Sequence, residues 1–148
     1  MIVVLQRVSK AEIKIKNNLI GKINKGLVVL LGINKGDKKQ DADFLIKKIL
    51  TLRIFNDSDG KMNLSVKEIT GSILLVSQFT LCADTAKGRR PSFLNAEGHQ
   101  RSKRLYEYFL IMLRKKGILV EAGHFGADMD IELINNGPVT IIINSIDS

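Results

Sequence analysis

Residues 74–93 of this chain read LLVSQFTLCADTAKGRRPSF, and this stretch decides both the fold and the position of the site. It begins as an apolar, β-branched run, which predicts a strand buried on both faces. The predicted strand continues without a break into a more polar segment, Ser77, Gln78, Phe79 and Thr80. A buried hydroxyl or amide without a partner costs about 1–3 kcal/mol. Polar residues at the end of a buried strand therefore indicate a functional site.

A basic loop follows this strand. It contains Lys87, Arg89 and Arg90, and Gly88 lets the backbone bend close to a phosphate group. The strand end and the loop together suggest a small polar pocket with a basic lip. The alternative is that the hydroxyls are ordinary cross-strand partners, that Gln78 points to solvent and that the loop is a solvated turn.

Length and composition set the class of protein. A chain of 148 residues fits one domain, residues 1–148, with a sizeable core. The 23 Lys and Arg residues against 15 Asp and Glu residues give a net charge of +8, which favours polyanionic partners. The single cysteine, Cys82, excludes an internal disulfide framework. No apolar run suits a signal peptide or approaches the roughly 20 residues of a membrane span, so we expect a cytoplasmic protein that does not contact membranes.

The periodicity of apolar residues predicts the elements. Strands are expected at residues 1–8, 11–16, 19–23 and 26–33, opening the chain as a β-meander with a turn at Asn17-Asn18. Helices are expected at residues 38–50, with Asp37 and Gln40 as a capping box, and at 95–116, closed by Gly117. Further strands are expected at 52–56, 118–121, 129–134 and 139–144, with a hairpin loop at 57–60. This order predicts an α+β fold, an antiparallel or mixed sheet curled into a β-barrel-like domain with two helices packed outside.

Most catalytic motifs are missing from the sequence. His99 and His124 each stand apart from cysteine or paired acids, so we expect no metal site and no cofactor. A serine-type triad would have to be assembled from distant residues: Ser77 or Thr80, a histidine, and Asp84 or Asp128. Neither hydroxyl lies in a Gly-x-Ser-x-Gly elbow, which disfavours that arrangement.

The segment NNGPVT at residues 135–140 is more informative. Gly-Pro between two strands is usually a plain turn. X-Pro bonds also tolerate the cis form at a cost of about 0.5–1 kcal/mol, and a cis Gly-Pro can turn two successive carbonyl oxygens the same way with no side chain in front of them. Such a pair would be a rigid acceptor for an ammonium group. Spacing alone leaves both interpretations open.

Several motifs in one order carry a resemblance over essentially the whole chain. They are QRV at 6–8, LRIF at 52–55 with GKMN at 60–63, SQFTL at 77–81, KGRRPSF at 87–93, FGADM at 125–129 and NGPVT at 136–140. The sequence resembles the D-aminoacyl-tRNA deacylases, also called D-tyrosyl-tRNA deacylases. The resemblance implies a homodimer of β-barrel-like subunits that hydrolyses the ester of D-aminoacyl-tRNA, with glycine mischarged on tRNA-Ala as a further substrate.

The resemblance also implies roles for individual residues. The Gly137-Pro138 dipeptide, in the cis form, reaches into the partner's pocket, where its carbonyls hold the α-amino group and exclude L side chains, and Arg7 orients the dipeptide. Residues Ser77 to Thr80 line the pocket that takes the aminoacylated acceptor end of the tRNA, with Ser77 binding the substrate and Gln78, Phe79 and Thr80 as the catalytic residues. The backbone amides of Phe79 and Thr80 face the ester carbonyl and stabilise the oxyanion. Phe125 and Met129 form the wall of the pocket.

The chemistry expected of such a site is modest. An aminoacyl ester is already activated, so its hydrolysis needs a positioned water and a stabilised oxyanion more than a strong protein nucleophile. The resemblance implies that the 2′-hydroxyl of the terminal adenosine takes part, with Thr80 as the alternative nucleophile. We favour the RNA-assisted route because Thr80 has no histidine or lysine base within its motif. The cations Lys87, Arg89 and Arg90 would then contact tRNA phosphates.

Two other classes of function compete with this one. A non-catalytic nucleic-acid-binding module would explain the positive charge, but it should expose aromatic rings for stacking, and the chain has only six Phe, two Tyr and no Trp. A general ester or peptide hydrolase would explain Ser77 and Thr80, but it predicts a base that the sequence does not offer.

Overall fold

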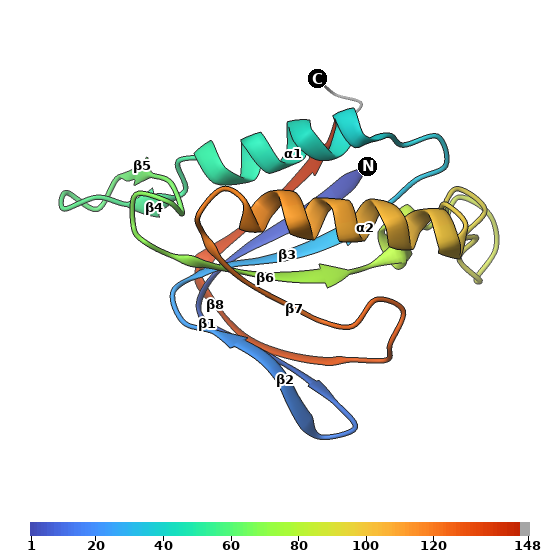
Figure 1. Cartoon of the computed structure of the whole chain (residues 1–148), viewed down its shortest axis with the longest axis horizontal. Helices are drawn as coiled ribbons and strands as arrows, with labels where there is room; N and C mark the ends of the chain where they lie inside the picture. Colours follow the sequence, from blue (N-terminus) through green and yellow to red (C-terminus); the bar gives the residue numbers. More distant parts are fainter. Residues whose placement is uncertain (146–148) are drawn as a thin grey trace.

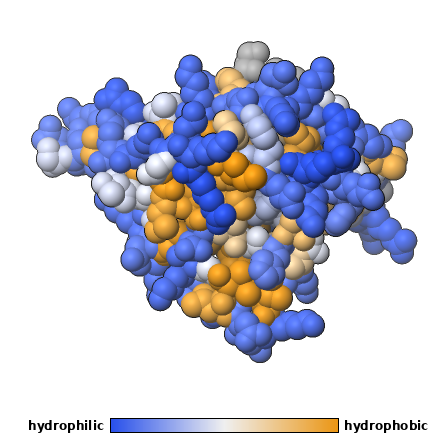
Figure 2. Space-filling model, in the orientation of Figure 1, coloured by the Kyte–Doolittle hydropathy of each residue, from blue (hydrophilic) through white to orange (hydrophobic). Residues whose placement is uncertain are grey.

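The structure, a computed structural model, describes residues 1–145. Its strands form a mixed sheet that curls into an almost closed barrel, and the helices α1 (Lys39–Thr51) and α2 (His99–Arg114) lie side by side against one face of it (Figure 1). This arrangement confirms the predicted α+β class. Hydrophilic side chains cover most of the face that α2 presents to solvent, with a few apolar patches between them (Figure 2).

The sheet is built around its first strand. The strands are β1 (Ile2–Ile15), β2 (Asn18–Ile23), β3 (Gly26–Gly32), β4 (Phe55–Asn56), β5 (Met62–Leu64), β6 (Ser72–Ser77), β7 (Leu119–Ala122) and β8 (Asp130–Asn144). Their order is β2-β1-β3-β6-β7, and β8 pairs with β1 as well. The pairs β3–β6 and β6–β7 are parallel, whereas β1 runs antiparallel to β2, β3 and β8. A small hairpin, β4–β5, stands apart as a second sheet.

The predicted β-meander is wrong, because β1 is a single long strand. Residues 2–8 of β1 pair with β3 and residues 11–15 pair with β2, so β2 and β3 share β1 and do not pair with each other. The turn into β2 also lies one residue earlier than predicted. Lys16 and Asn17 have positive φ values of 48° and 66°, the backbone that the two central residues of a tight hairpin turn require.

Two apolar clusters explain why β3 and β6 are apolar throughout. Leu27, Val29 and Leu75 point toward the helices and pack against the buried faces of α1 and α2. Val28 and Leu74 point the other way, into the barrel, where they join buried residues of β1 and β2. Each of these strands is therefore buried on both faces, as the continuous apolar runs predicted.

The capping residue of α1 and the start of α2 differ from the prediction. Asp37 does not cap α1, since its carboxylate accepts hydrogen bonds from the Met1 amino group at 2.6 Å and from the Asn34 N–H at 2.7 Å. The side chain that caps α1 is Asp41, which accepts the Lys38 N–H at 2.8 Å. Helix α2 begins at His99, after Gly98 in an extended conformation, and not at residue 95. Gly117 follows its last turn with φ 75°, as the glycine stop signal predicted.

The last strand also differs from the prediction. The expected strands at 129–134 and 139–144 are one strand, β8, and Gly137-Pro138 lies within it instead of in a turn between two strands. Pairing with β1 passes from Gln6 opposite Thr140 to Val8 opposite Asn135, so residues 136–139 bulge opposite a single β1 residue, Arg7. The Gly137-Pro138 peptide bond is cis.

Candidate functional site

A cavity of about 530 Å³ opens where β6 ends. Its walls come from the ends of β3 and β6, from the start of α2 and from the segment that joins β7 to β8. The predicted site residues that line it are Ser77, Gln78, Phe79, Phe125 and Met129. Sequence segments about 50 residues apart thus meet at one cavity. Thr80, Arg7, Gly137 and Pro138 are not among the residues that line the cavity of their own chain.

The chain turns sharply at the rim of this cavity. Strand β6 ends at Ser77, and residues Phe79–Cys82 form a short 3-10 helix, η1, so the predicted strand through Thr80 is wrong. Gln78 is the pivot, because its N–H still donates to the Leu31 carbonyl at 2.8 Å. The side chains of Phe79 and Thr80 are exposed rather than buried, and the Phe79 ring packs against Phe93 with 5.0 Å between ring centroids.

The turn leaves two backbone amides without a partner. The first N–H groups of a helix have no carbonyl to bond within that helix. Neither the Phe79 N–H nor the Thr80 N–H donates a hydrogen bond to any group within residues 1–145. The Gln78 side-chain amide donates to the Thr80 hydroxyl at 2.5 Å, which holds the side chains of this turn together. Two adjacent free donors at the rim of a cavity are suited to stabilise a negatively charged oxygen.

Phe125 forms a fixed wall of the cavity. Its ring lies between His99 and Tyr106, at centroid distances of 5.3 Å and 5.4 Å. The Tyr106 hydroxyl donates to the Leu75 carbonyl at 3.2 Å, and burial raises the pKa of Tyr106 to about 12, so it remains a neutral donor. The wall is therefore anchored to the sheet through α2.

The sequence does not predict Glu97 or Ser102 at the cavity, and it offers His99 only as a possible member of a triad. Glu97, His99 and Ser102 line the cavity, because the loop before α2 and the first turn of the helix border the opening. The sequence signal is Gly98, because glycine is a favoured residue immediately before a helix. In the structure the loop ends at Gly98, in an extended conformation, and α2 begins at the next residue. The Gly98 N–H donates to the Glu97 carboxylate at 2.8 Å and, as the largest cause, lowers the pKa of that carboxyl.

The serine-type triad gains no support from the geometry. Ser77, His99 and Asp128 all line the cavity, so the fold does bring a hydroxyl, an imidazole and a carboxylate to one place. Within the described part of the chain, however, no hydrogen bond joins any two of them. In the same residues no group of three or more His, Cys, Asp or Glu side chains is placed to hold a metal ion. None of the helices described is long and apolar enough to cross a membrane.

The Gly137-Pro138 dipeptide lies on the outside of β8, where both residues are exposed. Arg7, which is only 6% exposed, faces it from β1. The Arg7 Nε donates to the Asn136 carbonyl at 3.0 Å, one residue before the dipeptide. The contact between Arg7 and the dipeptide segment is therefore present, although the dipeptide does not reach the cavity of its own chain.

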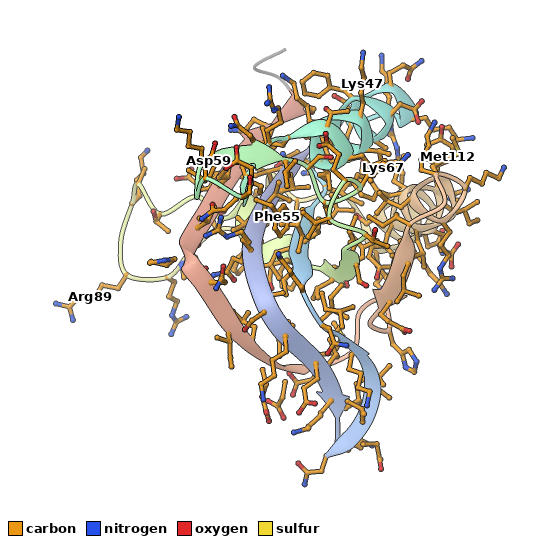
Figure 3. The ribbon with its side chains drawn as sticks, turned by 90° about the vertical axis from the view of Figure 1, so that its left-hand side faces the viewer. Lys47, Phe55, Asp59, Lys67, Arg89 and Met112 are labelled. Carbon is orange, nitrogen blue, oxygen red and sulfur yellow. The ribbon has the colours of Figure 1, made fainter. Side chains whose placement is uncertain are left out.

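The basic loop stands out from the barrel. Asp84 and Ser92 close its base with paired backbone hydrogen bonds of 2.8 Å and 2.9 Å, and Gly88 has φ 71°. Lys87, Arg89 and Arg90 are exposed, and Figure 3 shows Arg89 at the outer edge of the molecule. None of these cations lines the cavity.

Comparison with known proteins identifies the family. The family model described as D-Tyr-tRNA(Tyr) deacylase matches residues 4–144. The D-aminoacyl-tRNA deacylase of Thermosipho melanesiensis is 52% identical over 143 residues, which is 96% of this chain and 95% of that protein. The protein of the same name from Clostridium perfringens is 50% identical over 145 residues, 98% of this chain and 97% of that protein.

Solved structures agree with the fold. One, described as a c-Myc DNA unwinding element binding protein, superposes with a TM-score of 0.93 at 39% identity and covers 97% of this chain and 98% of its own. Another, described as a probable eukaryotic D-amino acid tRNA deacylase, has a TM-score of 0.82 over the same shares at 18% identity, a likeness of fold alone. From the family match and the curated relatives together, the chain belongs to the D-Tyr-tRNA(Tyr) deacylase family.

Proposed function

We propose that this protein hydrolyses the ester bond of D-aminoacyl-tRNA and releases the free D-amino acid and tRNA. The observation that carries the proposal is the pair of free amides at Phe79 and Thr80 beside the cavity, in a chain of the deacylase family. An ester carbonyl placed against these amides would become more negative during attack, and the fixed donors stabilise that charge. Ser77 and Gln78 position the aminoacyl group, and Phe125 and Met129 form the wall behind it.

The site is complete in a homodimer. Gly137 and Pro138 are exposed on β8 and absent from their own cavity, which suits a role in the pocket of the partner. The same strand exposes Ile134 by 50% and Ile142 by 63%, apolar surface that a second copy would cover. In the assembled site the Gly137 and Pro138 carbonyls accept the α-amino group of the substrate and leave no room for an L side chain.

This filter acts on the side of the Cα that an L side chain would occupy. A glycyl ester has no side chain and passes such a filter, so glycine mischarged on tRNA-Ala is a further substrate. The place of action is the cytoplasm, where aminoacyl-tRNA is used and where the single cysteine, Cys82, stays reduced. The proposed reaction uses no cofactor.

Attack is assisted by the RNA. The 2′-hydroxyl of the terminal adenosine lies next to the ester and can orient or activate the attacking water. Thr80 is exposed, and the partner that the structure gives its hydroxyl is the Gln78 amide, which donates to it and cannot take its proton. The hydroxyl therefore lacks the base that a nucleophile needs.

A Thr80→Ala variant should accordingly keep its activity within about fivefold of the wild type, the size of effect expected from the loss of one neutral hydrogen bond. Single-turnover deacylation of D-tyrosyl-tRNA measures this directly. Thr80→Val, which keeps the side-chain volume, separates loss of the hydroxyl from loss of packing. A fall to the uncatalysed rate in both variants would establish Thr80 as a chemical participant and disprove the RNA-assisted route.

The basic loop should steer the tRNA. Reversing the charge at Arg89 and Arg90 with glutamate is expected to raise KM about tenfold and to lower the salt dependence of kcat/KM by about one to two units of slope, because each lost phosphate contact removes about 0.7–0.9. Charge reversal at Lys47 and Lys48 is the matched control, because these two exposed cations lie on α1, which does not line the cavity. Equal salt dependence in the two double variants and the wild type would make the loop structural.

The decisive experiment compares D- and L-tyrosyl-tRNA with the pure protein. We expect deacylation of the D ester at least about a hundredfold faster than of the L ester, since exclusion of a misplaced group is worth several kcal/mol. Equal hydrolysis of both esters would make the protein a non-selective esterase. Hydrolysis of neither would disprove the proposal.

A second candidate function is binding to nucleic acid without turnover. The structure at 39% identity is described as a DNA unwinding element binding protein, and this chain carries a net charge of +8. Binding of duplex DNA of several sequences and of uncharged tRNA, titrated at 50 and 200 mM salt, tests this candidate. Tight, sequence-dependent DNA binding together with no deacylation would favour it over the enzyme.

A further inference from the structure

Arg7 is a buried cation held by neutral groups. It is 6% exposed, and no ion pair of the described chain includes it. Its three hydrogen-bond acceptors are the Asn136 carbonyl at 3.0 Å, the Ile54 carbonyl at 2.7 Å and the Asn56 Oδ1 at 3.1 Å. A charged group removed from water depends strongly on each partner that replaces its hydration. The position of Arg7 is therefore set by these three oxygens.

Asn56 differs from the other two acceptors because its oxygen belongs to a side chain. The Asn56 Oδ1 and the Ile54 carbonyl both accept from Arg7 Nη1, while Nε is held by the Asn136 carbonyl. A guanidinium is planar and rigid, so these three hydrogen bonds, two at Nη1 and one at Nε, together hold its plane and the position of Nη2. Removing the Asn56 oxygen would leave Nη1 with a single acceptor and free the plane to tilt.

The position of Nη2 matters for the dipeptide. A Cβ built on Gly137 would lie 2.6 Å from Arg7 Nη2, so the guanidinium packs directly against that glycine. The Asn136 carbonyl, which Nε holds, immediately precedes it. A tilt of the guanidinium thus displaces the surface on which Gly137-Pro138 rests.

Asn56 sits on an element that holds it in place. Asn56 belongs to β4 and lies opposite Met62 of β5 in the β4–β5 hairpin. The Asp57 carboxylate closes the loop of this hairpin, because it accepts hydrogen bonds from the Lys61 N–H at 2.9 Å and from the Asn63 side-chain amide at 2.7 Å. Figure 3 looks onto this hairpin, on which Asp59 and Phe55 are labelled, and Phe55 belongs to the same buried cluster as Val3 and Leu5 of β1.

We propose that Asn56 is a positioning residue for the chiral filter: through Arg7 it sets the location of Gly137-Pro138 and thereby the ratio of D to L ester hydrolysis. This inference rests on the proposed function. It assigns Asn56 no contact with substrate. Its contribution is to discrimination, because a displaced dipeptide both holds the α-amino group less well and leaves room for an L side chain.

The test measures kcat/KM for D- and L-tyrosyl-tRNA in three variants. Asn56→Ala should lower the D to L ratio about tenfold, the factor expected for loss of a hydrogen bond to a charged group. Asn56→Asp keeps an oxygen at the same position and should stay within about twofold of the wild-type ratio. Asn63→Ala, the same substitution on the partner strand, removes a side chain that bonds Arg53 and Asp57 but not Arg7, and should leave the ratio unchanged.

The outcomes separate this inference from the proposed function. A wild type without D preference would disprove the proposed function, and the inference with it. With a selective wild type, an unchanged ratio in Asn56→Ala would overturn the inference alone. So would an equal fall in Asn63→Ala, which would trace the effect to loosening of the hairpin, or an equal fall in Asn56→Asp. Asn56 is itself exposed, and melting curves of the three variants check that each is folded at the temperature of the assay.

Discussion

Substituting Gly137 with alanine is expected to slow hydrolysis of D-tyrosyl-tRNA by about tenfold to a hundredfold. Gly137 has φ 123°, where an L side chain is strained, and strain of this kind costs about 1–3 kcal/mol. The added Cβ would also lie 2.6 Å from Arg7 Nη2 and 3.0 Å from Val139 Cγ2. Relief of both contacts requires the dipeptide to move away from Arg7. The carbonyls proposed to hold the α-amino group then move with it.

A second glycine in the left-handed region supplies the control. Gly117 has φ 75° and no atom within 4 Å of an added Cβ, and it follows α2 away from the cavity. Gly117→Ala carries the backbone strain without the clash, so it should lower the melting temperature a little and leave the D ester rate unchanged. Single-turnover rates of D-tyrosyl-tRNA hydrolysis by Gly137→Ala and Gly117→Ala show whether the position of the dipeptide, rather than backbone strain alone, controls the rate. Full activity of Gly137→Ala at an unchanged melting temperature would mean that the dipeptide is an ordinary bulge.

The sheet was predictable because burial on both faces leaves a plain signal. The runs at residues 26–33 and 74–76 are apolar at every position, and both are central strands packed between the helices and the barrel interior. The two helices followed from apolar residues at helical spacing. What periodicity does not contain is which strand pairs with which, so β1 was divided in two and its pairing with both β2 and β3 was missed.

The site was predictable in its motifs and less so in its geometry. Ser77 and Gln78 do line a cavity, but the sequence did not signal that β6 ends at Ser77 or that η1 begins at Phe79, because apolar and β-branched residues continue through both. The place of His99 on the cavity wall was not predictable for a related reason. The helical pattern extends back to residue 95, whereas tertiary packing starts α2 at residue 99 and leaves the preceding loop at the cavity.

A large loss of stability is expected from a substitution in the core beneath α2. Phe109 is fully buried in the cluster between the helices and the sheet. Replacing a buried phenylalanine with alanine costs about 3–5 kcal/mol, which for a chain of this size lowers the melting temperature by roughly 10 °C. Because the first turn of α2 carries His99 and Ser102 to the cavity, a loosened helix also opens the wall of the site.

Ile111, two residues further along α2, is the matched control, since it is 52% exposed and Ile111→Ala should change stability by no more than about 0.5 kcal/mol. Calorimetry of both variants at one protein concentration, with the D ester rate followed over the same temperatures, tests the pair. We expect activity of Phe109→Ala to disappear at its own, lower melting temperature. If the two variants melt together, α2 is not held to the sheet through Phe109. If activity is lost well below melting, the start of α2 loosens before the sheet does, and the wall at Phe125 depends on α2 more than on β6.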